Sequence, residues 1–211
     1  MGKPAFFVRL HGCPVHCPWC DSAGTWHPNW VPKDVRKMTA GEIAQEAYNE
    51  EMDIAVVTGG EPAVYDLVPL VAAFHGNGIK VHLETSGGFP FTDLFDWVTL
   101  SPKKWKPPIE QSVMLADEFK IIVEHPDDIP DYYLMLLDKG LPAAAGNPIW
   151  LHPEWSHRND PAVIGAIIDE VKAGGGRFRA GWQLHKLYSV DALDQRSRPL
   201  VPLGGDPAKG L

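Results

Sequence analysis

Short runs of β-branched and aromatic residues alternate along the chain with stretches that repeat apolar residues at helical spacing. The first kind predicts strands at 5–10, 54–58, 80–85, 97–100, 118–123, 149–152 and 178–184. The second kind predicts helices at 39–50, 67–76, 128–138 and 160–173, the first of them opened by a capping box of Thr39 and Glu42. This alternation is typical of βα units around a parallel sheet.

The unusual residues lie just after the predicted strands. A cysteine-containing loop follows the first strand, and GGEP, TSGG, SPKK, EHPDD and HPEW follow the next five, while QLHK ends the seventh. In a parallel α/β barrel these segments gather at one face, where active sites are built. We therefore expect an α/β fold, a partial TIM-like barrel of parallel strands, with residues 1–186 as one compact domain. Residues 187–211, rich in Pro, Gly, Asp and Arg, predict an extended tail packed on the same domain.

Composition narrows the class of protein. The chain has 211 residues, 45% of them hydrophobic and 22% charged, which suits one globular domain. Its 27 acidic and 19 basic residues give a formal net charge of -8, which argues against a nucleic-acid-binding surface. No apolar run reaches the roughly 20 residues that cross a bilayer, and 5–10 is too short for a signal-peptide core. We expect a cytoplasmic protein without a membrane partner.

The three cysteines of the chain lie close together as C-x-x-x-C-x-x-C, at Cys13, Cys17 and Cys20. An odd number excludes a closed set of internal disulfides. Soft thiolates favour zinc, copper or an iron-sulfur cluster. Structural zinc needs four ligands, and His11, His16 or His27 offers a fourth, but three cysteines alone favour an iron-sulfur cluster with one open iron.

The cysteine motif after the first strand, followed by GGEP after a later one, resembles the radical S-adenosylmethionine superfamily. Within it the chain is similar to the 7-carboxy-7-deazaguanine synthase family. The similarity is carried by FVR-x-x-GC, CDS-x-x-T-W, TGGEP, ETSG, LSPK and Q-x-HK, which occur in family order from Phe7 to Lys186. It implies a lyase that converts 6-carboxy-5,6,7,8-tetrahydropterin to 7-carboxy-7-deazaguanine with release of ammonia, in queuosine and 7-deazapurine biosynthesis.

The resemblance also assigns residues. It implies that Cys13, Cys17 and Cys20 ligate a [4Fe-4S] cluster and that S-adenosylmethionine contacts Gly59, Gly60, Glu61, Ser86, Ser101 and Lys103. It implies Mg2+ at Ser22 and a substrate site made of Arg9, Asp21, Gln183 and His185. A guanidinium suits the pterin carboxylate, and a carboxylate suits ring N–H groups. The implied partners are a flavodoxin or ferredoxin as electron donor and a second copy of the chain in a homodimer.

Two alternatives stay open from the sequence. A glycyl-radical activating enzyme is also small and uses the same cysteine spacing, but acts on a protein backbone. A non-catalytic zinc or iron-sulfur binding module would use the same cysteines without a substrate.

Overall fold

The strands form one open, fully parallel sheet. The computed structural model describes residues 3–28, 35–142 and 146–187. Its sheet runs in sequence order from β1 to β7, each strand paired with the next one along the chain. The strands are β1 (Phe6–Leu10), β2 (Ile54–Gly59), β3 (Lys80–Thr85), β4 (Trp97–Leu100), β5 (Glu118–Val123), β6 (Ile149–Pro153) and β7 (Phe178–Ala180). Within the described residues β1 and β7 do not pair with each other, so the barrel is open and the predicted partial barrel is confirmed.

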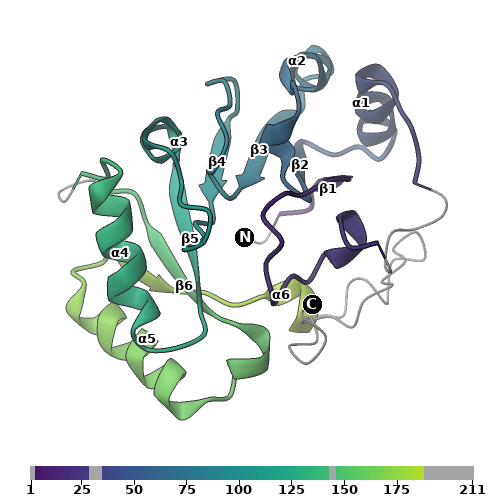
Figure 1. The fold of residues 1–211 in the computed structure, drawn as a ribbon. Helices are drawn as coiled ribbons and strands as arrows, with labels where there is room; N and C mark the ends of the chain where they lie inside the picture. The colour runs from purple at the N-terminus through teal and green to yellow at the C-terminus, as the bar shows by residue number, and fades with distance from the viewer. Residues whose placement is uncertain (1–2, 29–34, 143–145, 188–211) are drawn as a thin grey trace.

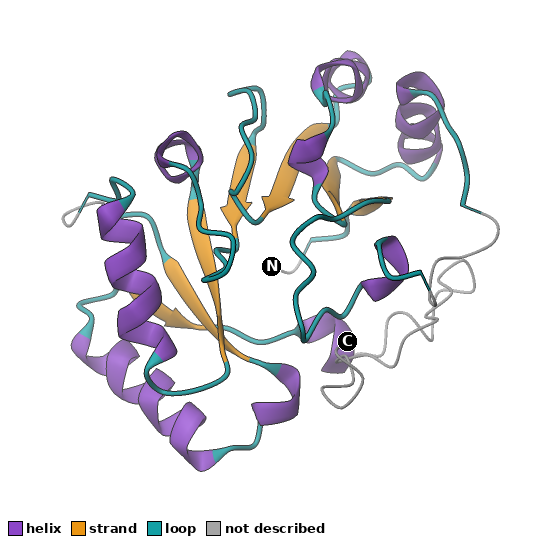
Figure 2. Cartoon of the chain, in the orientation of Figure 1, coloured by secondary structure: helices purple, strands orange, loops and turns teal. Residues whose placement is uncertain are grey.

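The helices between consecutive strands cover the convex side of this sheet, whereas the short helix after β7 lies on its open side (Figures 1 and 2). The α-helices are α1 (Ala40–Asn49), α2 (Val68–Gly76), α3 (Glu110–Leu115), α4 (Asp128–Asp138), α5 (Pro161–Ala173) and α6 (Leu184–Leu187). Short 3-10 turns lie at Ala23–Thr25 (η1), Pro62–Val64 (η2) and Trp155–His157 (η3). The predicted capping box is present, since the Thr39 side chain accepts from the backbone N–H of Glu42 and the Glu42 side chain accepts from that of Thr39. No helix among the described residues is long and apolar enough to cross a membrane.

Alternate strand positions separate the core from the concave face. One set packs against the helices and forms the apolar core, with members such as Val57, Leu83 and Phe119 fully buried. The other set is polar or aromatic on five strands, and comprises Arg9, His82, Glu84, Thr99, Glu118, Lys120, Trp150 and His152. Because side chains alternate along a strand, these groups face the inside of the curved sheet.

The last strand is shorter than predicted. We expected 178–184, but β7 ends at Ala180, and Leu184–Leu187 form α6. Gly181 makes the last ladder contact, from its N–H to the carbonyl of Leu151 at 2.9 Å. A Cβ at Gly181 would lie 2.1 Å from His152 Nε2, so this position directly after β7 has room only for glycine. The short helix α3 was not predicted, and of the predicted tail only Leu187 lies within the described residues.

The core position Phe119 offers a test of this packing. Phe119 is 0% exposed in the middle of the sheet, so Phe119→Ala should lower the free energy of unfolding by about 3–5 kcal/mol. Met114→Ala is the matched control, because Met114 is 71% exposed and its loss should change stability by no more than about 0.5 kcal/mol. Urea unfolding of both variants measures the difference, and equal effects would contradict the core assignment.

Candidate active site

The cysteine loop is fixed to the end of β2 by backbone hydrogen bonds. Gly60 N–H donates to the carbonyl of Leu10 at 2.8 Å, and Glu61 N–H donates to that of Gly12 at 2.9 Å. Gly12 N–H in turn donates to the carbonyl of Thr25 at 2.6 Å, which closes the loop on itself. In Figure 1 this segment crosses the open side of the sheet from β1 toward α6.

Two glycines make this close approach possible. Gly59 has a φ of 125°, in the region that L side chains rarely adopt. A Cβ on Gly60 would lie 2.0 Å from the carbonyl oxygen of Gly12 and 3.1 Å from the Cβ of Cys13. Glycine is therefore needed at both positions so that the cysteine loop can pack against the end of β2.

The three cysteine thiols are free and lie near one another. Cys17 is buried, while Cys13 and Cys20 are half-buried. Burial raises the pKa of Cys13, and it raises the pKa of Cys17 to about 12 because charge is costly away from water. The neighbouring cysteines push both values the same way. In the part of the chain that the structure describes, no three His, Cys, Asp or Glu side chains are placed to hold a single metal ion.

This arrangement suits a cluster. A single tetrahedral ion with metal–sulfur bonds of about 2.3 Å would need its thiolates about 3.8 Å apart. In a cluster held by three cysteines each thiolate binds a different iron, so the sulfurs need not converge on one point. Trp26 Nε1 lies 3.3 Å from the sulfur of Cys20 and donates a hydrogen bond to it, as is usual for a sulfur ligand.

Lys103 supplies a buried positive charge beside these thiols. Lys103 is only 6% exposed. Its Nζ donates to the carbonyl oxygen of Ser101 at 2.5 Å and to the hydroxyl oxygen of the same residue at 2.7 Å. Burial lowers the pKa of Lys103, and Cys17 opposes that shift. Reciprocally, the Lys103 charge favours the thiolate of Cys17. The predicted pair Ser101 and Lys103 therefore lies at the cysteine loop.

Glu61 is committed to internal hydrogen bonds. It is 1% exposed, and its carboxylate accepts from Ala63 N–H at 3.1 Å and from Thr85 Oγ1 at 2.6 Å. The other oxygen accepts from the N–H of Ser86 at 2.8 Å and from its hydroxyl. A buried carboxylate needs such partners. The side chains of Glu61 and Ser86 thus join the ends of β2 and β3.

The predicted substrate residues from opposite ends of the chain meet at Asp21. Gln183 Nε2 donates to Asp21 Oδ2 at 2.9 Å across 162 residues of sequence. The same oxygen lies 3.5 Å from His185 Nε2 and 3.4 Å from Lys186 Nζ. Withdrawal from solvent would raise the pKa of Asp21, but the hydrogen bond with His185 and the charge of Lys186 outweigh this and lower it. Lys186 joins the site although we had assigned it no role.

Arg9 completes this group from β1. Its side chain is exposed, and in the described residues it makes no hydrogen bond or ion pair. It is close enough to stabilise the charged forms of Asp21 and Glu84. The guanidinium is therefore available to a ligand on the concave face.

The sequence reasoning missed a charged pair on the concave face. Lys120 Nζ on β5 lies 2.5 Å from Glu84 Oε2 on β3, with β4 between them. Withdrawal from solvent would raise the pKa of Glu84, but the Lys120 ammonium outweighs it and lowers the value. The sequence did contain a signal for this pair, since polar and apolar residues alternate in KVHLET and EFKIIV and place Glu84 and Lys120 on the face opposite the core.

Buried polar atoms without partners lie at the end of β6 and just after β7. Among the described residues they include His152 Nδ1, Trp182 Nε1 and Gln183 Oε1. Burial lowers the pKa of His152 to about 3, so its imidazole is neutral at physiological pH. Buried orphan donors and acceptors are uncommon, and here they mark the place where a polar ligand would find partners.

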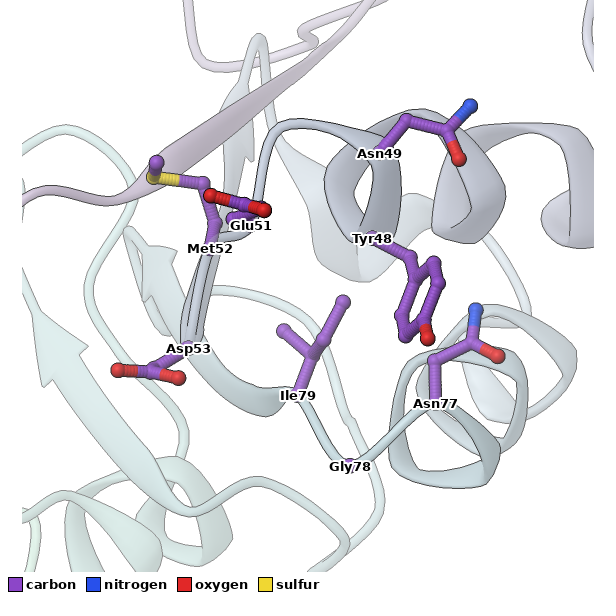
Figure 3. Close-up of a pocket in the computed structure, with 8 residues that line it drawn as sticks. All are labelled: Tyr48, Asn49, Glu51, Met52, Asp53, Asn77, Gly78 and Ile79. Carbon is purple, nitrogen blue, oxygen red and sulfur yellow. The ribbon is translucent and has the colours of Figure 1, made fainter.

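A separate cavity of about 480 Å³ lies at the opposite end of the strands (Figure 3). Its lining includes Tyr48 and Asn77 from the ends of α1 and α2, with Asp53 and Ile79 just before β2 and β3. It contains none of the predicted site residues. The chemistry of the chain therefore concentrates at the carboxyl ends of the strands, as expected for this fold class.

Several known proteins are similar to this chain. Residues 7–124 match the family model of the Radical SAM superfamily. The 7-carboxy-7-deazaguanine synthase of Synechocystis sp. is 43% identical over 90% of this chain and 85% of its own length. The chain belongs to the 7-carboxy-7-deazaguanine synthase family. The enzyme of that name from Flavobacterium psychrophilum is 29% identical over 90% of this chain and 84% of its own length.

A solved structure agrees with this membership of the synthase family. The crystal structure of QueE from Escherichia coli superposes with a TM-score of 0.69 and 28% sequence identity, covering 85% of this chain and 86% of that one. Members of the radical S-adenosylmethionine superfamily use a [4Fe-4S] cluster and S-adenosylmethionine, so both predicted cofactors are confirmed at the level of the superfamily. The matches favour a synthase of a small molecule over a glycyl-radical activating enzyme or a non-catalytic module.

Gly60 gives a test of how the cysteine loop is held. Gly60→Ala places a Cβ against the Gly12 carbonyl, so the variant should be less stable and should retain less iron and sulfide after anaerobic reconstitution. Gly165→Ala is the matched control, since nothing lies within 4 Å of its Cβ position in α5. That control should gain about 0.5–1 kcal/mol of stability and bind a full cluster. A fully loaded Gly60→Ala protein would show that the loop does not need this contact.

Proposed function

We propose that this chain is a ring-contracting lyase that converts 6-carboxy-5,6,7,8-tetrahydropterin to 7-carboxy-7-deazaguanine and ammonia, with the substrate held over the concave face at Asp21. The observation that carries the proposal is the contact of Asp21 with Gln183 at 2.9 Å. It joins CDS in the cysteine loop to Q-x-HK after β7, beside the thiols. A substrate there would lie next to both the cluster and the interior of the sheet.

Three cysteines and the glycine turn would hold the cofactors. Cys13, Cys17 and Cys20 supply the thiolates, and the buried ammonium of Lys103 offsets part of their charge. When bound, the cluster supplies the electron that splits S-adenosylmethionine into methionine and the 5′-deoxyadenosyl radical used for hydrogen abstraction. Gly59 and Gly60 would offer backbone groups to the methionine end, while the hydrogen bonds between Glu61 and Ser86 would keep the strand ends beneath it rigid.

Side-chain groups that have hydrogen-bonding capacity left at this site suit the parts of the substrate. The unpaired guanidinium of Arg9 suits the pterin carboxylate through two parallel hydrogen bonds. The carboxylate of Asp21 and the orphan Oε1 of Gln183 accept hydrogen bonds from ring N–H groups. His185 remains within 3.5 Å of Asp21 and orients it. Neutral His152 offers one further acceptor or donor at the same mouth.

The remaining expectations belong to the same proposal. Ser22 Oγ donates to the Gly59 carbonyl at 3.3 Å, so its lone pairs are left for Mg2+ together with substrate oxygens. A flavodoxin or ferredoxin would supply electrons. We further propose a cytoplasmic homodimer, in which residues 1–186 form the domain and 187–211 a tail packed on it.

Arg9→Ala tests the substrate assignment. The variant should retain the full cluster and cleave S-adenosylmethionine, but the KM for the carboxytetrahydropterin should rise about tenfold or more, because a charge-assisted contact contributes about 1.5–3 kcal/mol. Product formation under anaerobic conditions, measured by chromatography, gives both parameters. Arg36→Ala is the control, since that arginine is paired with Glu46 at the surface. Loss of iron in Arg9→Ala would instead place Arg9 in the cluster site.

Substitutions of Ser22 test the proposed magnesium site. Removal of Mg2+ with a chelator should slow turnover of the wild-type enzyme, and titration should restore it. Ser22→Ala should need a higher Mg2+ concentration for half-maximal activity, whereas Ser22→Thr keeps the oxygen ligand and should behave like wild type. Identical Mg2+ titration curves for all three proteins would remove Ser22 from the metal site.

A further inference from the structure

The segment that brings Gln183 to the site ends in a single turn of helix. α6 comprises only Leu184–Leu187, and the N–H groups of Lys186 and Leu187 both donate to the carbonyl of Gln183, at 3.1 and 3.4 Å. One turn of helix is not stable by itself in water, because too few hydrogen bonds offset the cost of ordering its backbone. Contacts with the rest of the protein must therefore fix this segment.

The polar side chains of the segment converge on one carboxylate oxygen. Asp21 Oδ2 lies 2.9 Å from Gln183 Nε2, 3.5 Å from His185 Nε2 and 3.4 Å from Lys186 Nζ. Among the described residues these three side chains have no other hydrogen-bond or ion-pair partner. One oxygen has two lone pairs, so three donors exceed what Asp21 Oδ2 can satisfy. The segment therefore needs a second attachment.

The indole of Trp155 provides that attachment. Lys186 Nζ lies 5.2 Å from the centroid of the ring, within the distance of about 6 Å at which an aromatic face attracts a cation. The Lys186 side chain is only 2% exposed, so little water competes with the ring for the ammonium. Burial lowers the pKa of Lys186, and the charge of Asp21 opposes that shift. An aromatic face favours the ammonium in the same sense as Asp21 does.

Trp155 belongs to a loop that is fixed independently of α6. It opens η3, which the buried carboxylate of Glu154 caps by accepting from the N–H of Ser156 at 2.8 Å. The N–H of Glu154 donates to the carbonyl of Val123, at the end of β5, at 2.8 Å. The guanidinium of Arg158 lies over the same indole, with its central carbon 4.6 Å from the centroid. The ring that receives Lys186 is therefore held at the ends of β5 and β6.

We propose that Trp155 is a positioning residue for the substrate site, because its indole holds the Lys186 ammonium against Asp21. The segment that carries Gln183 and His185 is held together with Lys186. The inference rests on the proposed function, since Asp21 and Gln183 are the groups assigned there to the pterin. Trp155 acts through Lys186 and not by contact with the substrate.

Hydrogen–deuterium exchange tests whether Trp155 holds α6. In the protein with its reconstituted cluster, the N–H groups of Lys186 and Leu187 should exchange about fivefold faster or more in Trp155→Leu, which keeps an apolar side chain but removes the aromatic face. Trp155→Phe keeps a smaller ring and should lie between Trp155→Leu and wild type. Tyr133→Leu is the matched control, because it removes a ring 5.3 Å from the guanidinium carbon of Arg177, at the other end of β7. It should leave the exchange of α6 unchanged.

Steady-state kinetics test the consequence for the substrate. Trp155→Leu should raise the KM for the carboxytetrahydropterin about fivefold or more and leave kcat within about threefold, because only binding depends on the indole. Trp155→Phe should recover part of the loss, and Tyr133→Leu should match wild type. Lys186→Met should also raise the KM, and adding Trp155→Leu to it should change the KM by less than about twofold, since the indole acts through Lys186. Cleavage of S-adenosylmethionine without pterin should stay within about twofold of wild type in each variant.

Each contrary outcome overturns the positioning role. Wild-type exchange of α6 in Trp155→Leu would show that the indole does not hold the segment. Faster exchange with an unchanged KM would separate α6 from the substrate site. An equal rise of KM in Tyr133→Leu, or an additive rise when Trp155→Leu is added to Lys186→Met, would assign the effect to a general loss of stability. If the wild-type protein forms no 7-carboxy-7-deazaguanine, the proposed function fails, while the exchange measurement still decides whether Trp155 holds α6.

Discussion

The site depends on the close approach of two backbone segments, the cysteine loop after β1 and the glycine turn after β2. The Gly12 carbonyl occupies the position where any side chain at Gly60 would begin. The hydrogen bonds from Gly60 and Glu61 to Leu10 and Gly12 form only at that separation. The position of all three thiols relative to the strands therefore follows from the absence of one Cβ.

Glu61 extends this constraint from two strands to three. Its carboxylate is almost completely withdrawn from water, and each oxygen accepts two hydrogen bonds, from Ala63 and Thr85 on one side and from Ser86 on the other. Leaving a buried charge unpaired is costly, so the three bonds from Thr85 and Ser86 fix the ends of β2 and β3 relative to each other. The motif GGEP combines a backbone requirement, the missing Cβ of Gly60, with an electrostatic one, the paired carboxylate of Glu61, and both keep the strand ends beside the thiols rigid.

The proposed substrate site is built differently, from charged side chains on the concave face of the sheet. Asp21 reaches it from the cysteine loop, Arg9 from β1, and Lys186 from α6. The pair of Glu84 and Lys120 lies below them on the concave face. Nearby positive charges lower the pKa values of Asp21 and Glu84, so these carboxylates give a polar ligand fixed acceptors inside a fold whose other face is apolar.

The sequence by itself determined the order and type of most elements, because apolar periodicity and turn residues act over a few positions. Strands β3, β4 and β5 have the predicted bounds, and the capping box at Thr39 starts α1 as expected. The spacing of the three cysteines likewise indicated an iron-sulfur cluster without knowledge of the fold. The predicted end of β7 was wrong. The strand ends where its pairing with β6 ends, and this pairing joins segments that are far apart in sequence, so a local pattern does not reveal it.

Only the tertiary structure decided which distant residues meet. The pairing of Asp21 with Gln183, and of Glu84 with Lys120, depends on how far the sheet curves and on which face each strand presents. The internal hydrogen bonds of Glu61 and Ser86 were also visible only there, because a motif shows which groups are present but not whether they are already paired within the protein.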